Sequence, residues 1–121
     1  MPDPRQNTIN YLEIPVKDIA ATKDFFSNLF GWKFVDYGPD YSCFLGASID
    51  GGFYKSDNNG FSSTSSPLIV FYYDDIDKIK EKVITLSGNI VKDIYAFPGG
   101  RRFHFTDTNN NEYAIWTDKP E

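Results

Sequence analysis

The chain has 121 residues and a formal net charge of −5 at pH 7, from 12 Lys and Arg against 17 Asp and Glu. A domain of this length can bury a sizeable core without disulfides. The basic residues form no stripe, which argues against nucleic acid or an anionic membrane as a partner. No apolar run approaches the ~20 residues that a membrane span needs.

Cys43 is the only cysteine, so a disulfide within the chain is impossible. A lone thiol suits a reducing compartment, and residues 1–8 lack the apolar core of a secretory signal, so we expect a cytoplasmic protein. Cys43 lies in a strand-like run. A small packing residue is therefore favoured there over a reactive nucleophile.

The first predicted element is a strand in "NYLEIPV", residues 10–16. Its apolar residues point to one face, whereas Tyr11 and Glu13 point to the other. A helix over 18–30 follows, with Asp18 as its N-cap and Gly31 just after its end. Three further strand-like runs come next: "WKFVDY", "YSCFLGAS" and "GGFYKS". The extra phenylalanines of this helix, Phe25, Phe26 and Phe30, are interpreted as core residues in preference to a dimer contact.

The second half repeats the first at an offset of 57 residues, with 16–36 lying over 73–93 without a gap. It predicts a strand in "LIVFYY", a helix over 75–87 that begins at Asp75 and ends before Gly88, and three more strands. The identical pairs are Asp18/Asp75, Ile19/Ile76, Lys23/Lys80, Leu29/Leu86, Gly31/Gly88 and Asp36/Asp93.

Each half therefore reads β-α-β-β-β, which predicts an α+β fold with two tandem βαβββ modules in a single domain, residues 1–121. We expect module one at about 8–55, a polar linker that buries little at about 56–66, and module two at about 67–117. One helix covers only one face of a four-stranded sheet. The other faces, curled by twist, would then enclose a concave surface, here called the cup, with Tyr11 and Glu13 looking into it.

The last two strands are predicted to form a hairpin around "DTNNNE", residues 107–112. A three-residue loop with Asn110 in the left-handed conformation places His104 beside Ala114 and Arg102 beside Trp116. A bulge that shifts this register by one residue would instead turn Phe103 and Phe105 into the cup.

The first register gives a set of candidate ligand-binding residues that are mostly aromatic, with a few polar groups, as is typical of small-molecule sites. This set is Tyr11, Glu13, Tyr72, Arg102, His104 and Trp116, over an apolar floor of Leu68, Val70 and Ala114. Alternatives stay open: Tyr11 and Trp116 can fill an aromatic core, and Glu13 and Arg102 can form a structural ion pair. His104 and Glu13 are weak catalytic candidates, and no pair forms a recognisable catalytic dyad.

Three segments resemble the glyoxalase / bleomycin-resistance / extradiol-dioxygenase (vicinal-oxygen-chelate) superfamily: "NYLEIPVKDIAATKDFFSNLFGWKF", "VFYYDDIDKIKEKV" and "GGRRFHFTDTNNNEYAIW". The resemblance implies paired βαβββ modules that form a cup-shaped half-barrel, and it implies a homodimer. Fosfomycin-resistance relatives use the position that matches His104 to contact substrate, which favours the first register.

The resemblance also implies where a metal ion would be bound in metal-dependent relatives: on the first strand of each module and on a last strand. Those positions hold Tyr11, Leu68 or Ile69, and Ala114 here, with Gly51 and Gly52 on the last strand of module one. Because a divalent transition metal needs three or four N or O ligands, we expect no metal and no cofactor.

The favoured function is metal-independent binding of a small amphipathic or aromatic molecule in the cup. One alternative is a lyase or isomerase related to lactoylglutathione lyase that uses His104 and Glu13. A second is a non-catalytic interaction module whose cup is filled by its own side chains.

Overall fold

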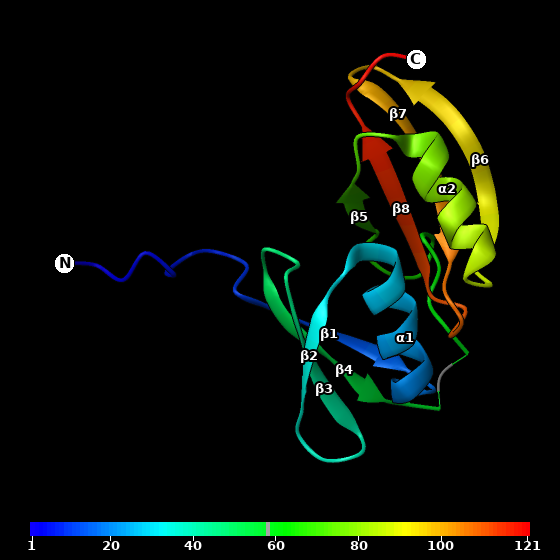
Figure 1. Ribbon diagram of the computed structural model, residues 1–121. Coiled ribbons are helices and arrows are strands. Elements are labelled where there is room, and N and C mark those ends of the chain that lie inside the picture. Colours follow the sequence, from blue (N-terminus) through cyan, green and yellow to red (C-terminus); the bar gives the residue numbers. More distant parts are fainter. Residues whose placement is uncertain (58) are drawn as a thin grey trace. The chain divides into compact units, whose positions relative to one another are not determined.

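The structure, a computed structural model, describes residues 1–57 and 59–121. It divides into two compact units, Met1–Asp57 and Asn58–Glu121, and each has the order β-α-β-β-β (Figure 1). The predicted α+β fold with two βαβββ modules is confirmed. The elements are β1 (Tyr11–Val16), α1 (Ile19–Phe30), β2 (Lys33–Asp36), β3 (Tyr41–Leu45), β4 (Asp50–Lys55), β5 (Ile69–Tyr72), α2 (Ile76–Thr85), β6 (Asn89–Phe97), β7 (Gly100–Thr106) and β8 (Glu112–Thr117).

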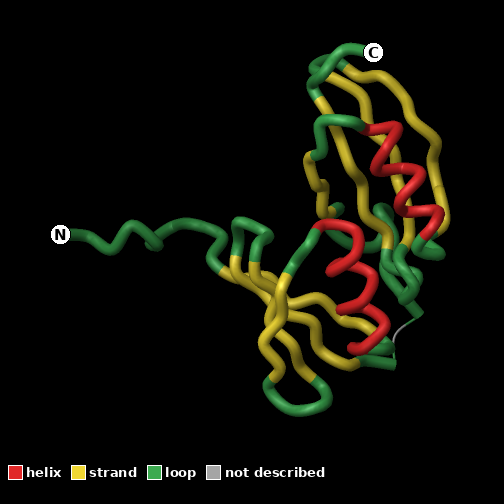
Figure 2. The backbone as a smooth tube through the Cα atoms, in the orientation of Figure 1, coloured by secondary structure: helices red, strands yellow, loops and turns green. Residues whose placement is uncertain are grey.

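Each unit builds an open, mixed four-stranded sheet with the same strand arrangement (Figure 2). The order is β1-β4-β3-β2 in the first sheet and β5-β8-β7-β6 in the second. The first and last strands of each unit pair in parallel, and the other neighbours pair antiparallel. The internal repeat in the sequence is therefore a repeat of topology.

Both helices begin at the predicted N-caps. The Asp18 carboxylate accepts from the Ala21 N–H at 2.9 Å, and the Asp75 carboxylate accepts from the Lys78 N–H at 3.1 Å. Gly31 ends α1 in the left-handed region with φ 75°, as predicted. The expected glycine end of α2 is wrong: α2 stops at Thr85, and Ser87 takes the left-handed conformation instead, with φ 72°.

The core of the first unit is aromatic and lies between α1 and its sheet. Phe26 is fully buried and stacks on Trp32 and Phe53, with ring centres 5.0 and 5.5 Å apart. Phe25 is 3% exposed and packs edge-on against Phe26. The interpretation of these helix phenylalanines as core residues is therefore confirmed for Phe25 and Phe26, and Phe30 stacks on Phe26 as a half-buried neighbour.

The core of the second unit lies between α2 and strands β7 and β8. Helix α2 buries three apolar side chains one turn apart, and β7 buries Phe103 and Phe105 completely. Tyr113 on β8 is also fully buried and lies 5.7 Å from Phe105 between ring centres. Because Phe103 and Phe105 are core residues, the alternate residues of β7 point to the face without a helix.

The closing hairpin has the first of the two registers considered above. His104 pairs with Ala114 and Arg102 with Trp116. Asn110 adopts φ 65°, and the Asp107 N–H donates to the Asn111 carbonyl at 3.1 Å. The alternative, in which a bulge turns Phe103 and Phe105 to the other face, is wrong.

The connection between the units makes contacts that its polar sequence does not indicate. The Phe61 ring packs edge-on against Tyr113 with ring centres 5.7 Å apart, and the Phe61 carbonyl accepts from the Glu112 N–H at 2.8 Å. Residues 59–66 are thus tied to β8. Asn58, which falls within the predicted linker, lies outside the described residues.

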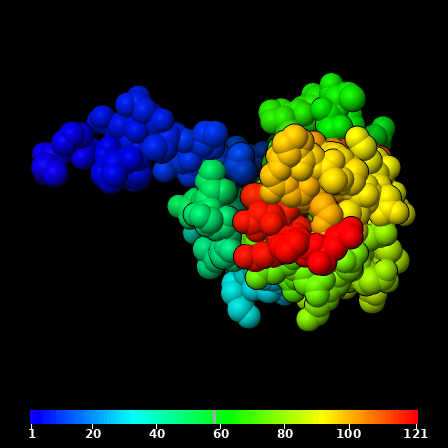
Figure 3. All heavy atoms as spheres, turned by 90° about the horizontal axis from the view of Figure 1, so that it is seen from above, coloured from blue at the N-terminus to red at the C-terminus, as the bar shows by residue number. Residues whose placement is uncertain are grey.

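The N-terminal residues, blue in Figure 3, contain a turn in which the Gln6 N–H donates to the Asp3 carbonyl at 3.1 Å. No helix in the described part of the chain is long and apolar enough to cross a membrane.

Candidate functional site

The second sheet gathers polar and aromatic side chains on the face opposite α2, here called the open face of the second sheet. Residues paired across neighbouring strands share a face, and so do residues two apart along one strand. Arg102 and His104 of β7 pair with Tyr95 and Lys92 of β6, and Glu112 lies two residues before Ala114 on β8. Register shifts in β6 on either side of Lys92 bring Tyr95 opposite Arg102.

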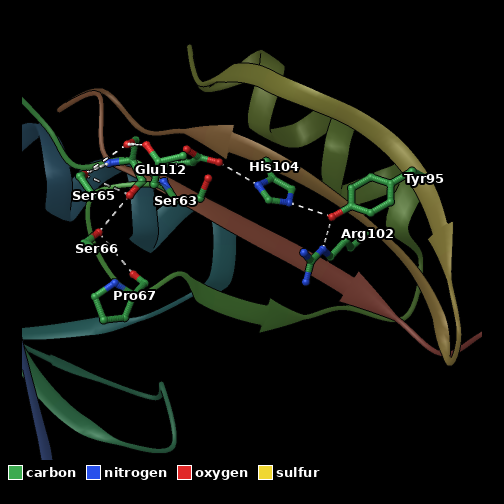
Figure 4. A network of polar contacts seen from close by, with 10 residues as sticks. Ser63, Ser65, Ser66, Pro67, Tyr95, Arg102, His104 and Glu112 are labelled. Carbon is green, nitrogen blue, oxygen red and sulfur yellow. Dashed lines mark hydrogen bonds and ion pairs between the residues drawn. The ribbon is translucent and has the colours of Figure 1, made fainter.

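Four of these side chains form a continuous chain of hydrogen bonds (Figure 4). Glu112 Oε2 lies 2.8 Å from His104 Nδ1, and the other ring nitrogen, Nε2, lies 3.0 Å from the Tyr95 hydroxyl. The same hydroxyl accepts from Nε of Arg102. At the other end, the Ser63 N–H donates to Glu112 Oε1 at 2.8 Å.

The charge on Glu112 sets the direction of the hydrogen bonds in this chain. Burial alone would raise the pKa of Glu112, but the Ser63 N–H and the His104 ring outweigh it and hold the pKa below its usual value. Glu112 is therefore an ionised acceptor at neutral pH, and His104 Nδ1 carries the proton. In the neutral ring Nε2 then accepts from the Tyr95 hydroxyl, so both nitrogens of His104 are engaged.

Aromatic rings continue this face beside Arg102. Trp116, the strand partner of Arg102, packs edge-on against Tyr72 at 5.2 Å and lies 6.2 Å from Phe97 between ring centres. The Tyr72 hydroxyl donates to Asp118 at 2.7 Å and to Asp74 at 2.8 Å. These two carboxylates raise the pKa of Tyr72, Asp118 most, so Tyr72 acts as a fixed neutral donor.

The first unit has its own polar cluster on the face of its sheet opposite α1. The hydroxyls of Tyr11 and Tyr41 lie 2.6 Å apart, and Tyr41 donates to Glu13 Oε2 at 3.0 Å. The Tyr11 hydroxyl also lies 3.3 Å from Cys43 Sγ. The Tyr41 ring lies directly over Gly52, where an added Cβ would come within 2.7 Å of three of its atoms. Gly52 therefore makes room for Tyr41.

Both phenols of this cluster are held in their neutral form. The Cys43 and Tyr41 contacts raise the pKa of Tyr11 well above its usual range. The pKa of Tyr41 is raised by burial, with the Glu13 hydrogen bond as a further cause. The cluster thus offers neutral hydroxyls and a half-engaged carboxylate.

The six candidate residues fall into three groups in the structure. Tyr11 and Glu13 are joined through Tyr41 in the first unit. In the second unit Arg102 and His104 are joined through Tyr95, and Tyr72 and Trp116 pack ring against ring. Val70 and Ala114, two residues of the apolar floor predicted for the cup, pair with each other across β5 and β8. Ala114 is fully buried, and Val70 is 40% exposed.

Sequence reasoning missed Tyr41, Tyr95 and Glu112. Glu112 was within reach, because strand alternation places it on the same face as Ala114. Tyr95 was not, since its orientation depends on the register shifts in β6, which no turn residue marks. Within the first unit Glu13 accepts from Tyr41, and within the second unit Arg102 donates to Tyr95.

The positions that would hold a metal ion in metal-dependent relatives do not fit one here. Ala114 has no donor atom, and the Tyr11 phenol is kept neutral by its neighbours. Within the described residues, no three His, Cys, Asp or Glu side chains are grouped as a metal ion requires.

Two surface hollows lie at the start of α2. One, of about 490 Å³, is lined by Tyr72, Tyr73, Asp74, Asp75 and Lys78. The other, of about 270 Å³, is lined by Asp74, Asp75, Ile76, Asp77, Arg101, Pro120 and Glu121. Tyr72 is the point at which the first hollow meets the aromatic rings described above.

Comparison with known proteins identified one matching family. The family model described as "Glyoxalase/Bleomycin resistance protein/Dioxygenase superfamily" matches residues 8–115. A search of curated proteins gave no significant match.

Solved structures of the same superfamily share the fold. A glyoxalase/bleomycin resistance protein/dioxygenase family enzyme from Burkholderia phytofirmans PsJN has TM-score 0.76 and 19% identity, over 89% of this chain and 96% of that one. The fosfomycin resistance protein FosX from Listeria monocytogenes has TM-score 0.76 and 21% identity, over 92% and 93%. A FosX mutant complexed with Mn(II) and 1S,2S-dihydroxypropylphosphonic acid has TM-score 0.75 and 19% identity, over 94% and 91%. At these identities the likeness shows the fold.

Proposed function

Because the chain belongs to the glyoxalase/bleomycin resistance protein/dioxygenase superfamily, we propose that it binds a small aromatic or amphipathic molecule without a metal ion. Binding would use the sheet faces that carry no helix, above all the open face of the second sheet. Trp116, Tyr72 and Phe97 supply apolar area there, and Arg102 supplies a hydrogen-bonding group.

The observation that carries this proposal is the engagement of His104. Its two ring nitrogens contact Glu112 and Tyr95, so neither is available to a metal ion without breaking a hydrogen bond. The chain has no other histidine. With Ala114 in place of a carboxylate, the residues that the structure describes in the second unit do not group the three or four donors that a divalent transition metal needs.

The experiment is metal analysis of protein purified without a tag and without chelators, combined with ligand binding in EDTA. We expect no stoichiometric Mn, Fe, Ni or Zn and undiminished binding of small aromatic probes in EDTA. A stoichiometric metal that is lost in His104→Ala would contradict the proposal.

A second candidate function, a lyase or isomerase, is favoured by one observation. The sequence offered His104 and Glu13 as separate, weak catalytic candidates, whereas the structure joins His104 to Glu112 and Tyr95. A carboxylate, an imidazole and a phenol in a row can move a proton. Loss of a measured activity in Tyr95→Phe with ligand affinity retained would support the enzyme over the binding protein.

We also propose a homodimer in the cytoplasm. The superfamily resemblance and the outer strands of both sheets support the dimer, since exposed strand edges need cover. The lone, half-buried Cys43 supports a reducing compartment.

A further inference from the structure

The open face of the second sheet carries two cationic side chains, although the chain as a whole is acidic. The chain has a net charge of −5, yet this face presents Lys92 and Arg102. Glu112, an acid of the same face, is already engaged by the Ser63 N–H and His104. Asp74 and Asp118, two further acids beside this face, accept from the Tyr72 hydroxyl. All three acids are therefore engaged by groups other than Lys92 and Arg102.

Arg102 is fixed in place with most of its hydrogen-bonding capacity unused. Nε donates to the Tyr95 hydroxyl, and Cζ lies 5.4 Å from the Tyr95 ring centre and 5.7 Å from that of Phe97. In the parts of the chain that the structure describes, the two terminal nitrogens of Arg102 have no hydrogen bond or ion pair. A guanidinium held in this way presents a planar fork of donors that matches a carboxylate.

Tyr95, whose hydroxyl accepts from Arg102, is itself held by other groups (Figure 4). Tyr95 contacts His104 Nε2. Glu112 orients His104, and the side chains of His104 and Glu112 are 8% and 9% exposed. The Lys92 ammonium lies 4.2 Å from the centre of the Tyr95 ring, which adds a second cation beside the phenol. Glu112, His104 and Tyr95 are therefore positioning residues for Arg102.

An apolar wall stands next to this cation. Trp116 is the strand partner of Arg102, and Tyr72 is the partner of Trp116 on the other side. The two rings pack edge-on, and Trp116 remains half exposed. A ligand whose anionic group meets Arg102 would lay an adjoining ring against Trp116.

We propose that the open face of the second sheet selects small aromatic monoanions, with the carboxylate bound by the terminal nitrogens of Arg102 and the ring packed on Trp116. The inference rests on the proposed small-molecule binding and adds the charge class of the ligand. It assigns to Arg102 the role of specificity-determining residue.

Three probes of the same shape and different charge test the proposal by isothermal titration in EDTA: benzoate, benzamide and benzylamine. We expect benzoate to bind at least about tenfold more tightly than benzamide, as one charge-assisted hydrogen-bonded pair supplies, and benzylamine to bind most weakly. If none of the three binds, the proposed function fails and the inference fails with it. If the three bind equally, the inference alone is overturned.

Variants locate the discrimination. Arg102→Gln should abolish the preference for benzoate over benzamide, and Arg102→Lys should keep part of that preference because the charge remains without the planar fork of donors. Arg101→Gln is the matched control, since Arg101 is the neighbouring residue on β7 and lies 3.8 Å from Glu121 instead. Tyr95→Phe should reduce the preference for benzoate, because this variant keeps the aromatic ring but removes the hydroxyl that accepts from Arg102. A preference that survives in Arg102→Gln, or is lost equally in Arg101→Gln, would overturn the assignment.

Discussion

His104 Nδ1 lies 2.8 Å from Glu112 Oε2, and the two side chains are only 8% and 9% exposed. This buried pair links the two strands of the closing hairpin, because His104 lies on β7 and Glu112 lies on β8. It also fixes the Tyr95 hydroxyl on the neighbouring strand β6. The stability of the second unit and the geometry of its open face therefore depend on the same two residues.

Glu112→Gln should lower the free energy of unfolding by about 1–3 kcal/mol, since a buried charged acceptor is lost. The effect should depend on pH in a defined direction. The folded-state pKa of Glu112 lies below the ordinary glutamate value of 4.5, so the carboxylate contributes stability above that value, and this stability is lost as pH falls through the folded pKa. Urea unfolding between pH 3 and 7 should show wild type losing more stability on acidification than Glu112→Gln. Parallel pH curves for the two proteins would contradict the assignment of an ionised Glu112.

Phe53→Ala should destabilise the first unit by about 3–5 kcal/mol because it leaves a cavity in a packed aromatic core. Phe53 is fully buried on β4 and contacts Phe26 and Phe44, with ring centres 5.5 and 5.3 Å away. Phe34→Ala is the matched control, since Phe34 is half-buried and lies at the edge of the same cluster. Chemical denaturation followed by Trp32 fluorescence measures both, and equal losses in the two variants would contradict this description of the core.

Gly52→Ala should displace Tyr41 and break its contacts with Tyr11 and Glu13, because the new Cβ would lie 2.6–2.7 Å from the Tyr41 ring and hydroxyl. Tyr41 is half-buried and its side chain can turn away, so the fold should persist. Gly51→Ala, one residue earlier, would press on the Leu12 carbonyl and the Phe44 ring and should cost more stability. Tyrosine ring resonances and thermal unfolding separate the two cases. A Gly52→Ala protein with unchanged Tyr11 and Tyr41 resonances would contradict the contact.

The proposed homodimer predicts light scattering at about twice the chain mass at micromolar concentration. Val35 on β2 and Val91 on β6 are 43% and 53% exposed on outer strands of their sheets. Introducing Lys at either position should favour the monomer if that edge is covered in the dimer. A mass of one chain for the wild type would refute the dimer.

Much of the fold could be predicted because the two halves of the sequence share one pattern of helix N-caps, apolar helix positions and strands. Lys23 and Asp36 form an ion pair at 2.9 Å, and their repeat partners Lys80 and Asp93 form one at 2.7 Å. The gapless alignment had matched these positions without foreseeing the contacts. The three-residue hairpin loop likewise predicted the pairing of His104 with Ala114, which the structure has, with Phe103 buried on the other face.

The polar network was harder to predict because it depends on irregular backbone. Tyr95 reaches His104 only through the register shifts in β6, and a period-two pattern cannot reveal a bulge. The end of α2 illustrates the same limit, since Ser87 adopts a conformation that sequence preference assigns to Gly88. Tyr41 was missed because its contact with Tyr11 is set by the pairing of β3 and β1 with β4.

Metal-independent binding of a small aromatic molecule on the second unit is tested most directly by the two tryptophan indole resonances during a benzoate titration in EDTA. Trp116 lies beside Arg102 on the open face, whereas Trp32 is 6% exposed in the core of the first unit and serves as an internal control. The account predicts a saturable shift of the Trp116 indole N–H, and of the Arg102 Nε–H, with Trp32 unchanged. An unmoved Trp116 signal, or a shift that appears only after a divalent metal is added, would contradict it.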